Sequence, residues 1–282
     1  NVGDTKLYLY ADTSSTNHIA YNDDGGTSLY SKISHRFDNV AALPTNLFFS
    51  EYAEGSSNNK YLEIFNGTGA AVDLSAYSIS RCSNGCNTNN EWDYPNTITF
   101  AAGTVVADGD VYVVHHSSAS SDIAAQGDQT TTYLSNGDDV AALTLAGATA
   151  STYTIIDIIG DMGDDPGSGW DVAGVTNGTK DHTLVRKSSV RSGNTNWTTS
   201  AGTNATDSEW VVHDQNTWTY VGSHTMPNLN QYYVKVTGYN GTYAGAYLLT
   251  ASSTSLPVAY GKVVINEINY NGPESGTDTT EF

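Results

Sequence analysis

The chain has 282 residues and a formal net charge of −19, from 30 acidic residues against 11 Lys and Arg. Only 15% of the residues are charged and 38% are hydrophobic, so uncharged Ser, Thr, Asn and Gly supply most of the polar surface. Such an acidic surface repels a phosphate backbone, which argues against nucleic acid as a direct partner. No run of about 18 apolar residues exists, so no membrane span is expected.

Short apolar runs and turn residues dominate the sequence, which predicts an all-β protein. No window repeats apolar residues with the spacing of a helix. The first strands are expected at residues 7–10, 18–21 and 28–33, before a connector that contains Pro44.

A longer series of strands is expected from Leu47 onward, with Asn-Gly and Asp-Gly turns between them, as in a β-sandwich. These strands are expected at residues 47–52, 61–66, 77–81, 97–100, 111–115, 140–145, 154–160, 182–187 and 209–213. Strands at 231–239 and 246–251 follow, then a linker at 252–260.

Cys82 and Cys86 flank the turn tripeptide Ser-Asn-Gly. A hairpin tip here would bring the two sulfur atoms within bonding distance, so we predict a disulfide that fixes the tip. The alternative is a pair of free thiols. The exterior-like composition favours the disulfide and predicts an extracellular or cell-surface protein, whose leader has been removed or lies outside this sequence.

Two acidic loops suggest Ca²⁺ as a possible cofactor, because Ca²⁺ takes several oxygen ligands in flexible geometry. The candidate ligands are Asp4, Asn22, Asp23 and Asp24 at the first loop, and Asp161, Asp164, Asp165 and Asp171 at the second. Asn, Asp and Gly are also ordinary turn residues, so a solvated turn is the alternative at both places.

Several segments resemble, in chain order, the pattern of bacterial lamin-tail domains. They are LFFSEY at 47–52, YLEIFN at 61–66, VDLSAY at 72–77, NGDDVAAL at 136–143, IDIIG at 156–160 and TLVRK at 183–187. The resemblance covers residues 46–224. It implies an immunoglobulin-like sandwich that serves as an accessory or interaction module beside extracellular nucleases and other surface proteins.

The flanks are similar to a different family, the pre-peptidase C-terminal domain. The similar segments are DTKLYLY at 4–10, IAYNDDG at 19–25, and QYYVKVTGYNG at 231–241 with GAYLL at 245–249. Because the two halves complement each other, we predict one discontinuous β-sandwich at 1–45 and 225–251, with the lamin-tail segment inserted. The alternative is two incomplete copies of that domain.

Residues 261–282 resemble the opening of a second lamin-tail domain, through VVINEINYN at 263–271. A single strand cannot fold alone, so it is expected to pair elsewhere, and it is a candidate for strand donation to a neighbouring subunit. The proposed assembly residues are Val263, Val264, Ile265 and Ile268.

Two further features concern the surface. The chain contains 19 Tyr, a residue enriched in contact surfaces and equally ordinary in strands. Asn-x-Ser/Thr sequons are candidates for glycosylation in a glycosylating compartment, at Asn66, Asn177, Asn196, Asn204 and Asn240.

No nucleophile elbow, phosphate loop or zinc-protease motif is present. The available glutamates fall in strands or turns of the lamin-tail pattern: Glu51, Glu54, Glu63 and Glu267. We therefore expect a non-enzymatic structural or adhesive protein whose partners are copies of itself or other surface proteins, forming a surface fibre by strand addition. The alternatives are the accessory region of a larger secreted nuclease or peptidase, and a carbohydrate- or collagen-binding module.

Overall fold

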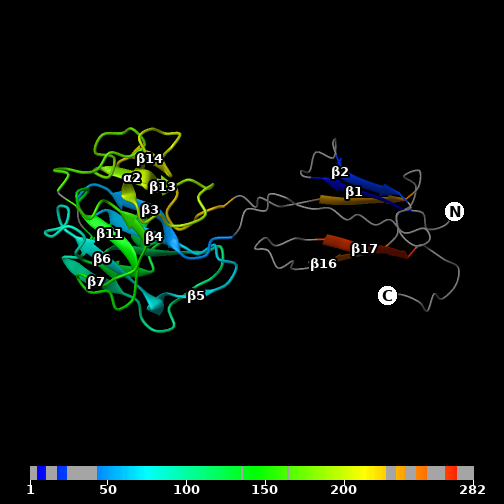
Figure 1. Ribbon diagram of the computed structural model, residues 1–282, viewed down its shortest axis with the longest axis horizontal. Coiled ribbons are helices and arrows are strands. Elements are labelled where there is room, and N and C mark those ends of the chain that lie inside the picture. Colours follow the sequence, from blue (N-terminus) through cyan, green and yellow to red (C-terminus); the bar gives the residue numbers. More distant parts are fainter. Residues whose placement is uncertain are drawn as a thin grey trace. The chain divides into compact units, whose positions relative to one another are not determined.

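The computed structural model describes residues 5–10, 18–23, 43–134, 136–163, 165–226, 233–238, 246–252 and 264–271. Their secondary structure is almost entirely β (Figure 1), which confirms the predicted fold class. The helices are short: α1 (Ser121–Ala124), α2 (Trp197–Ala201) and the 3-10 turn η1 (Leu74–Ala76). The chain divides into two units, Leu43–Pro227 and, on either side of it, Asn1–Ala42 with Asn228–Phe282.

The Leu43–Pro227 unit is an immunoglobulin-like sandwich of two sheets, ordered β10-β9-β4-β3-β13-β14 and β12-β11-β6-β7. The first sheet contains β3 (Phe48–Glu54), β4 (Lys60–Phe65), β9 (Val111–His116), β10 (Gln129–Thr131), β13 (His182–Arg186) and β14 (Trp210–Asp214). The second contains β6 (Tyr77–Cys82), β7 (Tyr94–Thr99), β11 (Val140–Leu145) and β12 (Ile155–Ile159). A small ribbon joins β5 (Val72–Asp73) to β8 (Val105–Val106). Within the two sheets only the β10–β9 pairing is parallel.

Alternating side chains of the two sheets enclose one apolar core. In β4, Leu62 and Ile64 face this core, whereas Glu63 between them faces the outer side of the sheet. That outer side is covered as well, by α1 and by the stretch that contains Trp218 and Val221. The central strands β3 and β4 are therefore buried on both faces.

The buried side chain of Arg186 links the edge strand β12 of the smaller sheet to Glu209, next to the edge strand β14 of the larger one. Its guanidinium donates to the Phe49 carbonyl (3.0 Å) and to the carboxylates of Asp157 and Glu209, and it lies 4.0 Å from the centre of the Trp210 ring. Burial raises the pKa of Asp157, while Arg186 acts in the opposite direction. Arg186 is therefore a buried structural side chain.

The second unit contains a sheet ordered β15-β1-β2, formed by β1 (Thr5–Tyr10), β2 (His18–Asp23) and β15 (Tyr233–Gly238). Thr5 lies opposite Gly238, and Tyr10 lies opposite Tyr233. This pairing joins, in one sheet, a segment that precedes the sandwich in the sequence and a segment that follows it. The strand expected at residues 28–33 lies outside the described residues.

The last strand has a partner within its own chain. β17 (Val264–Asn271) pairs antiparallel with β16 (Ala246–Ser252). The expectation that this strand lacks a partner in its own chain is therefore wrong. A role of Val264, Ile265 and Ile268 in assembly stays a prediction, and Val263 lies outside the described residues. Only residues 253–263 separate the two strands in the sequence, and closing a loop within one chain costs less entropy than recruiting a second molecule.

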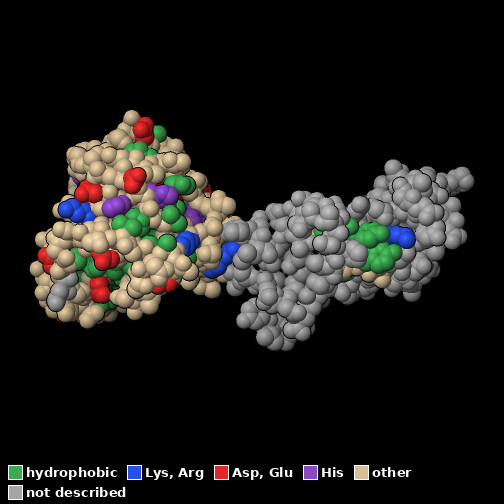
Figure 2. Space-filling model, turned by 90° about the horizontal axis from the view of Figure 1, so that it is seen from above, with side chains coloured by type: hydrophobic (Ala, Val, Ile, Leu, Met, Phe, Trp, Pro, Cys, Tyr) green, Lys and Arg blue, Asp and Glu red, His purple; other side chains and the backbone are tan. Residues whose placement is uncertain are grey.

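The surface of the Leu43–Pro227 unit is sparsely charged. On the face in Figure 2, acidic and basic side chains are scattered among uncharged polar ones. Among the described residues, none of the helices has the length and apolar character required to traverse a lipid bilayer.

Candidate functional site

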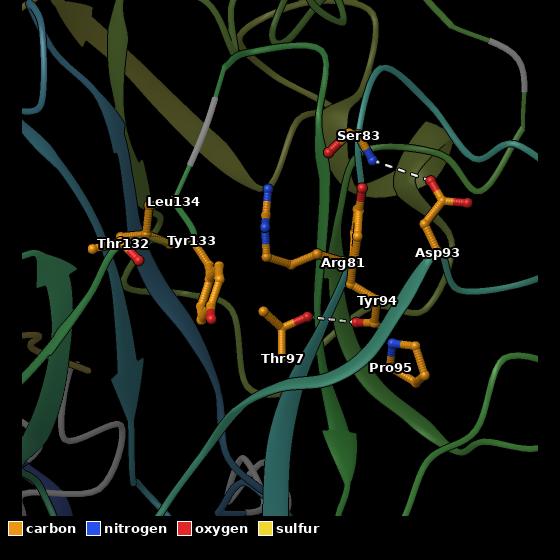
Figure 3. A pocket seen from close by; sticks show the side chains of 9 residues that line it. All are labelled: Arg81, Ser83, Asp93, Tyr94, Pro95, Thr97, Thr132, Tyr133 and Leu134. Carbon is orange, nitrogen blue, oxygen red and sulfur yellow. Dashed lines mark hydrogen bonds between the residues drawn. The ribbon is translucent and has the colours of Figure 1, made fainter.

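A groove of about 690 Å³ opens at one edge of the sandwich (Figure 3). One wall is the edge strand β7 of the smaller sheet, and the facing wall is the segment that follows β10, the edge strand of the larger sheet. The lining residues are Arg81, Ser83, Asp93, Tyr94, Pro95, Thr97, Thr132, Tyr133 and Leu134.

A disulfide anchors the loop beside the groove. Cys82 and Cys86 are bonded, with sulfur atoms 2.09 Å apart, as the turn tripeptide between them predicts. The backbone N–H of Ser83 within this loop donates to the Asp93 carboxylate (3.3 Å), which links the loop to the residue before β7. The disulfide therefore fixes one end of the groove.

Arg81 forms the floor of the groove. Its side chain is only 7% exposed, its guanidinium lies 3.6 Å from the Asp139 carboxylate, and the same group lies 6.0 Å from the centre of the Tyr94 ring. Burial lowers the pKa of Arg81, while Asp139 acts in the opposite direction. Figure 3 draws this side chain between Tyr94 and Tyr133.

The two tyrosines are the exposed part of the groove. Tyr94 is 49% exposed and Tyr133 is 55% exposed, whereas Leu134 beside them packs against the core. Thr97 supports the first tyrosine, because its hydroxyl donates to the Tyr94 carbonyl (2.6 Å). Two aromatic rings on opposite walls, with the Arg81 guanidinium between them (Figure 3) and hydroxyl and carboxylate groups elsewhere in the lining, form an arrangement suited to ligand binding.

The lining contains no histidine or cysteine among the described residues. The arrangement can hold a ligand through hydrogen bonds and aromatic contacts.

All nine residues that line the groove lie within one stretch that a known family matches. Residues 41–157 match the Lamin Tail Domain. This family has an immunoglobulin-like fold without enzymatic activity, so the match supports the resemblance seen in the sequence. The comparisons with curated proteins and with solved structures find no match.

We refer to Leu43–Pro227, of which the part up to Asp157 matches this family, as the lamin-tail unit. The family match ends at Asp157, but the sheet continues: β13, which carries TLVRK, pairs with β3 and with β14. The pre-peptidase C-terminal resemblance of the flanks and the second lamin-tail copy stay predictions.

Two glutamates that could have served acid–base chemistry are enclosed in the lamin-tail unit. Glu51 is 1% exposed and Glu63 is 0% exposed, beneath the outer cover of β3 and β4. Burial is the main cause that raises the pKa of Glu51 to about 8 and that of Glu63 to about 7. A substrate cannot reach either carboxyl group in this structure.

The Glu51 and Glu63 carboxyls are held by different donors. The Tyr61 hydroxyl donates to Glu51 Oε2 (2.6 Å), whereas Glu51 Oε1 has no hydrogen-bond partner. Glu63 accepts from the Ser50 hydroxyl (2.6 Å) and from the Gly222 N–H (2.7 Å). Their partners are structural, which assigns both residues to the packing of the cover.

The first acidic loop is only partly described. Asp4 and Asp24 lie outside the described residues, while Asn22 and Asp23 are the last residues of β2. Calcium binding at this loop stays a prediction.

The second acidic loop uses its carboxylates in turns. Asp165 accepts from the Gly167 N–H (2.7 Å), and Asp171 accepts from the Asn177 N–H (2.9 Å). Asp161 is exposed and Asp164 lies outside the described residues. Across the described part of the chain, no three His, Cys, Asp or Glu side chains form a group that could hold a metal ion.

The sequons differ in accessibility. Asn66 is buried and its amide donates to the Ala70 and Val106 carbonyls (2.8 and 2.9 Å), so the folded unit leaves no room for a glycan there. Asn196 and Asn204 are exposed and Asn177 is half-buried; Asn240 lies outside the described residues. Glycosylation at these four stays a prediction.

The groove was not predicted from the sequence. Its residues come from three separated segments, 81–83, 93–97 and 132–134, that meet only when the edges of the two sheets face each other. The abundance of Tyr and the cysteine pair next to Arg81 were the available signals.

Proposed function

We propose that this chain is a non-catalytic structural or adhesive part of an extracellular protein and that its lamin-tail unit is a binding module. The groove carries this proposal: it exposes two tyrosines on opposite walls, while Glu51 and Glu63, whose pKa values are raised, are enclosed beneath the cover of β3 and β4. Open contact surface combined with enclosed titratable groups favours recognition over chemistry.

Extracellular location is supported by the Cys82–Cys86 disulfide and by the scarcity of charge. Disulfides persist in oxidising compartments and are reduced in most cytosols. Antibody labelling of intact cells that produce the chain tests the location, and signal only after permeabilisation would contradict it.

We further propose that copies of the chain assemble into a fibre by strand addition. The β16–β17 pair is a two-stranded sheet among the described residues, and a lone pair of strands is marginal in water. The edge of β17 opposite β16 would accept a strand from another copy through backbone hydrogen bonds.

Deletion of residues 261–282 tests the fibre proposal. The shortened chain should stay monomeric by light scattering and form no filaments under the electron microscope, while the parent chain forms them. Tryptophan fluorescence is the folding control, because all 5 Trp lie in the lamin-tail unit. Equal filament formation by both chains would refute assembly through β17.

The rival function is the accessory region of a larger secreted nuclease or peptidase, which the lamin-tail resemblance implies. Reading the coding sequence beyond Phe282 discriminates between the two. Further lamin-tail modules would favour the fibre, whereas a catalytic domain with metal-ligand motifs would favour the rival.

A further inference from the structure

We propose that the groove between β7 and residues 132–134 binds a neutral oligosaccharide. This inference rests on the proposed function, in which the lamin-tail unit binds without catalysing, and it names the class of ligand. The volume of about 690 Å³ lies within the range of roughly 300–1,000 Å³ that ligand sites occupy.

The aromatic walls of the groove suit the apolar C–H faces of a sugar ring. A pyranose presents C–H groups on its faces, and these pack against aromatic rings. Tyr94 and Tyr133 offer such faces while about half of each side chain is open to solvent. Each ring is anchored at its backbone, since Thr97 donates to the Tyr94 carbonyl and the Tyr133 N–H donates to Thr131 (3.1 Å).

The polar lining of the groove suits the hydroxyl groups of a sugar. Hydroxyl groups of a sugar donate and accept hydrogen bonds, and the groove presents both capacities in Ser83, Thr97, Thr132 and the phenolic groups of the two tyrosines. Asp93 adds a carboxylate that accepts from the Ser83 N–H and the Asn87 N–H over long distances, 3.3 and 3.2 Å. It can therefore accept further hydrogen bonds from a ligand.

The charge balance favours a neutral ligand over an anionic one. Arg81 lies at the floor, but its charge is opposed by Asp139 at 3.6 Å, and Asp93 adds a negative charge to the lining. The chain as a whole carries −19, so an acidic polysaccharide would be repelled.

An extended peptide fits the groove less well. Pro95 removes a backbone donor from β7, and the pairing of β7 with β6 is irregular between Ile79 and Arg81. Both features hinder strand addition at this edge. A proline-rich peptide is the remaining protein ligand, and the experiment below separates it from a sugar.

Affinity electrophoresis of the full chain tests the inference. Native gels contain hydroxyethylcellulose, laminarin or galactomannan as neutral probes, and alginate or polygalacturonate as acidic ones. We expect slower migration in at least one neutral gel, and Tyr133→Ala and Tyr94→Ala should each weaken that affinity roughly tenfold. Tyr220→Ala is the matched control: this tyrosine is 41% exposed and lies outside the groove, so affinity should not change.

Four outcomes would overturn the inference. They are normal migration in every neutral gel, retardation that both groove variants retain, retardation in acidic gels alone, and binding of labelled decaproline that Tyr133→Ala abolishes. Unchanged tryptophan fluorescence of each variant shows that it is folded. Release of new reducing ends from a bound polysaccharide would refute the non-catalytic function and leave the assignment of the groove intact, so the two failures are distinguishable.

Discussion

Replacement of Glu51 by Gln is expected to stabilise the lamin-tail unit, increasingly so as the pH rises. Burial first, and the neighbouring Glu63 second, raise the pKa of Glu51 from 4.5 to about 8, against the hydrogen bond from Tyr61. In the unfolded chain the carboxyl regains its ordinary pKa. Between these two values the folded chain keeps a proton that the unfolded chain releases, so stability falls as the pH rises through this window.

The size of the effect follows from the pKa difference. One pKa unit corresponds to about 1.4 kcal/mol, so Glu51 alone should lower the free energy of unfolding by roughly 3 kcal/mol between pH 5 and pH 8. Gln keeps the shape of the side chain and still accepts the hydrogen bond from Tyr61, but it does not titrate. The difference between E51Q and the parent should therefore grow by this amount across the window.

Urea unfolding followed by tryptophan fluorescence at pH 5, 6, 7 and 8 measures the difference, since all 5 Trp lie in the lamin-tail unit. Glu91→Gln, at an exposed glutamate, is the control and should run parallel to the parent. Parallel pH profiles of E51Q and the parent would refute the burial argument.

Three further changes address other enclosed groups. Burial lowers the pKa of His224 from 6.5 to about 4, so the unfolded chain takes up the proton first as the pH falls; His224→Phe should gain about 2 kcal/mol over the parent at pH 5 and little at pH 8 in the urea assay. Arg186→Met should lower the free energy of unfolding by about 3–5 kcal/mol because Asp157 loses its buried partner, and a loss below about 1 kcal/mol would contradict this. Cys86→Ser opens a short loop and should cost about 2 kcal/mol at most; dithiothreitol should destabilise the parent equally and leave the variant unchanged.

The strand pattern of the lamin-tail unit was largely predictable, and the burial of its outer face was not. In YLEIF the charged Glu63 stands between two apolar residues, and the local sequence gives no sign that its face of the strand is buried. The structure covers that face with a segment about 160 residues later, whose Gly222 N–H donates to Glu63. Local alternation identifies a strand, but it does not show whether a distant segment of the chain covers the outer face of that strand.

The candidate site was also predictable only in part. The Cys82–Cys86 disulfide follows from local turn chemistry, and the sequence indicated it correctly. The groove depends on which strands end at the sheet edges, β7 and β10, and strand order is not encoded in any single segment. The partner of β17 was missed for a related reason. The strand could pair with β16 of its own chain or with a strand of another molecule, and its local sequence does not distinguish between the two.

The pairing of Thr5 with Gly238 sets the order in which the chain can acquire its structure. During synthesis β1 must wait until β15 has emerged, whereas the lamin-tail unit can already collapse on its own core. Near Gly67, Pro44 at the entry of that unit and Met226 at its exit lie close together. Once folded, the unit therefore replaces a long flexible loop by a short bridge between the flanks, which lowers the entropic cost of bringing β1 and β15 together.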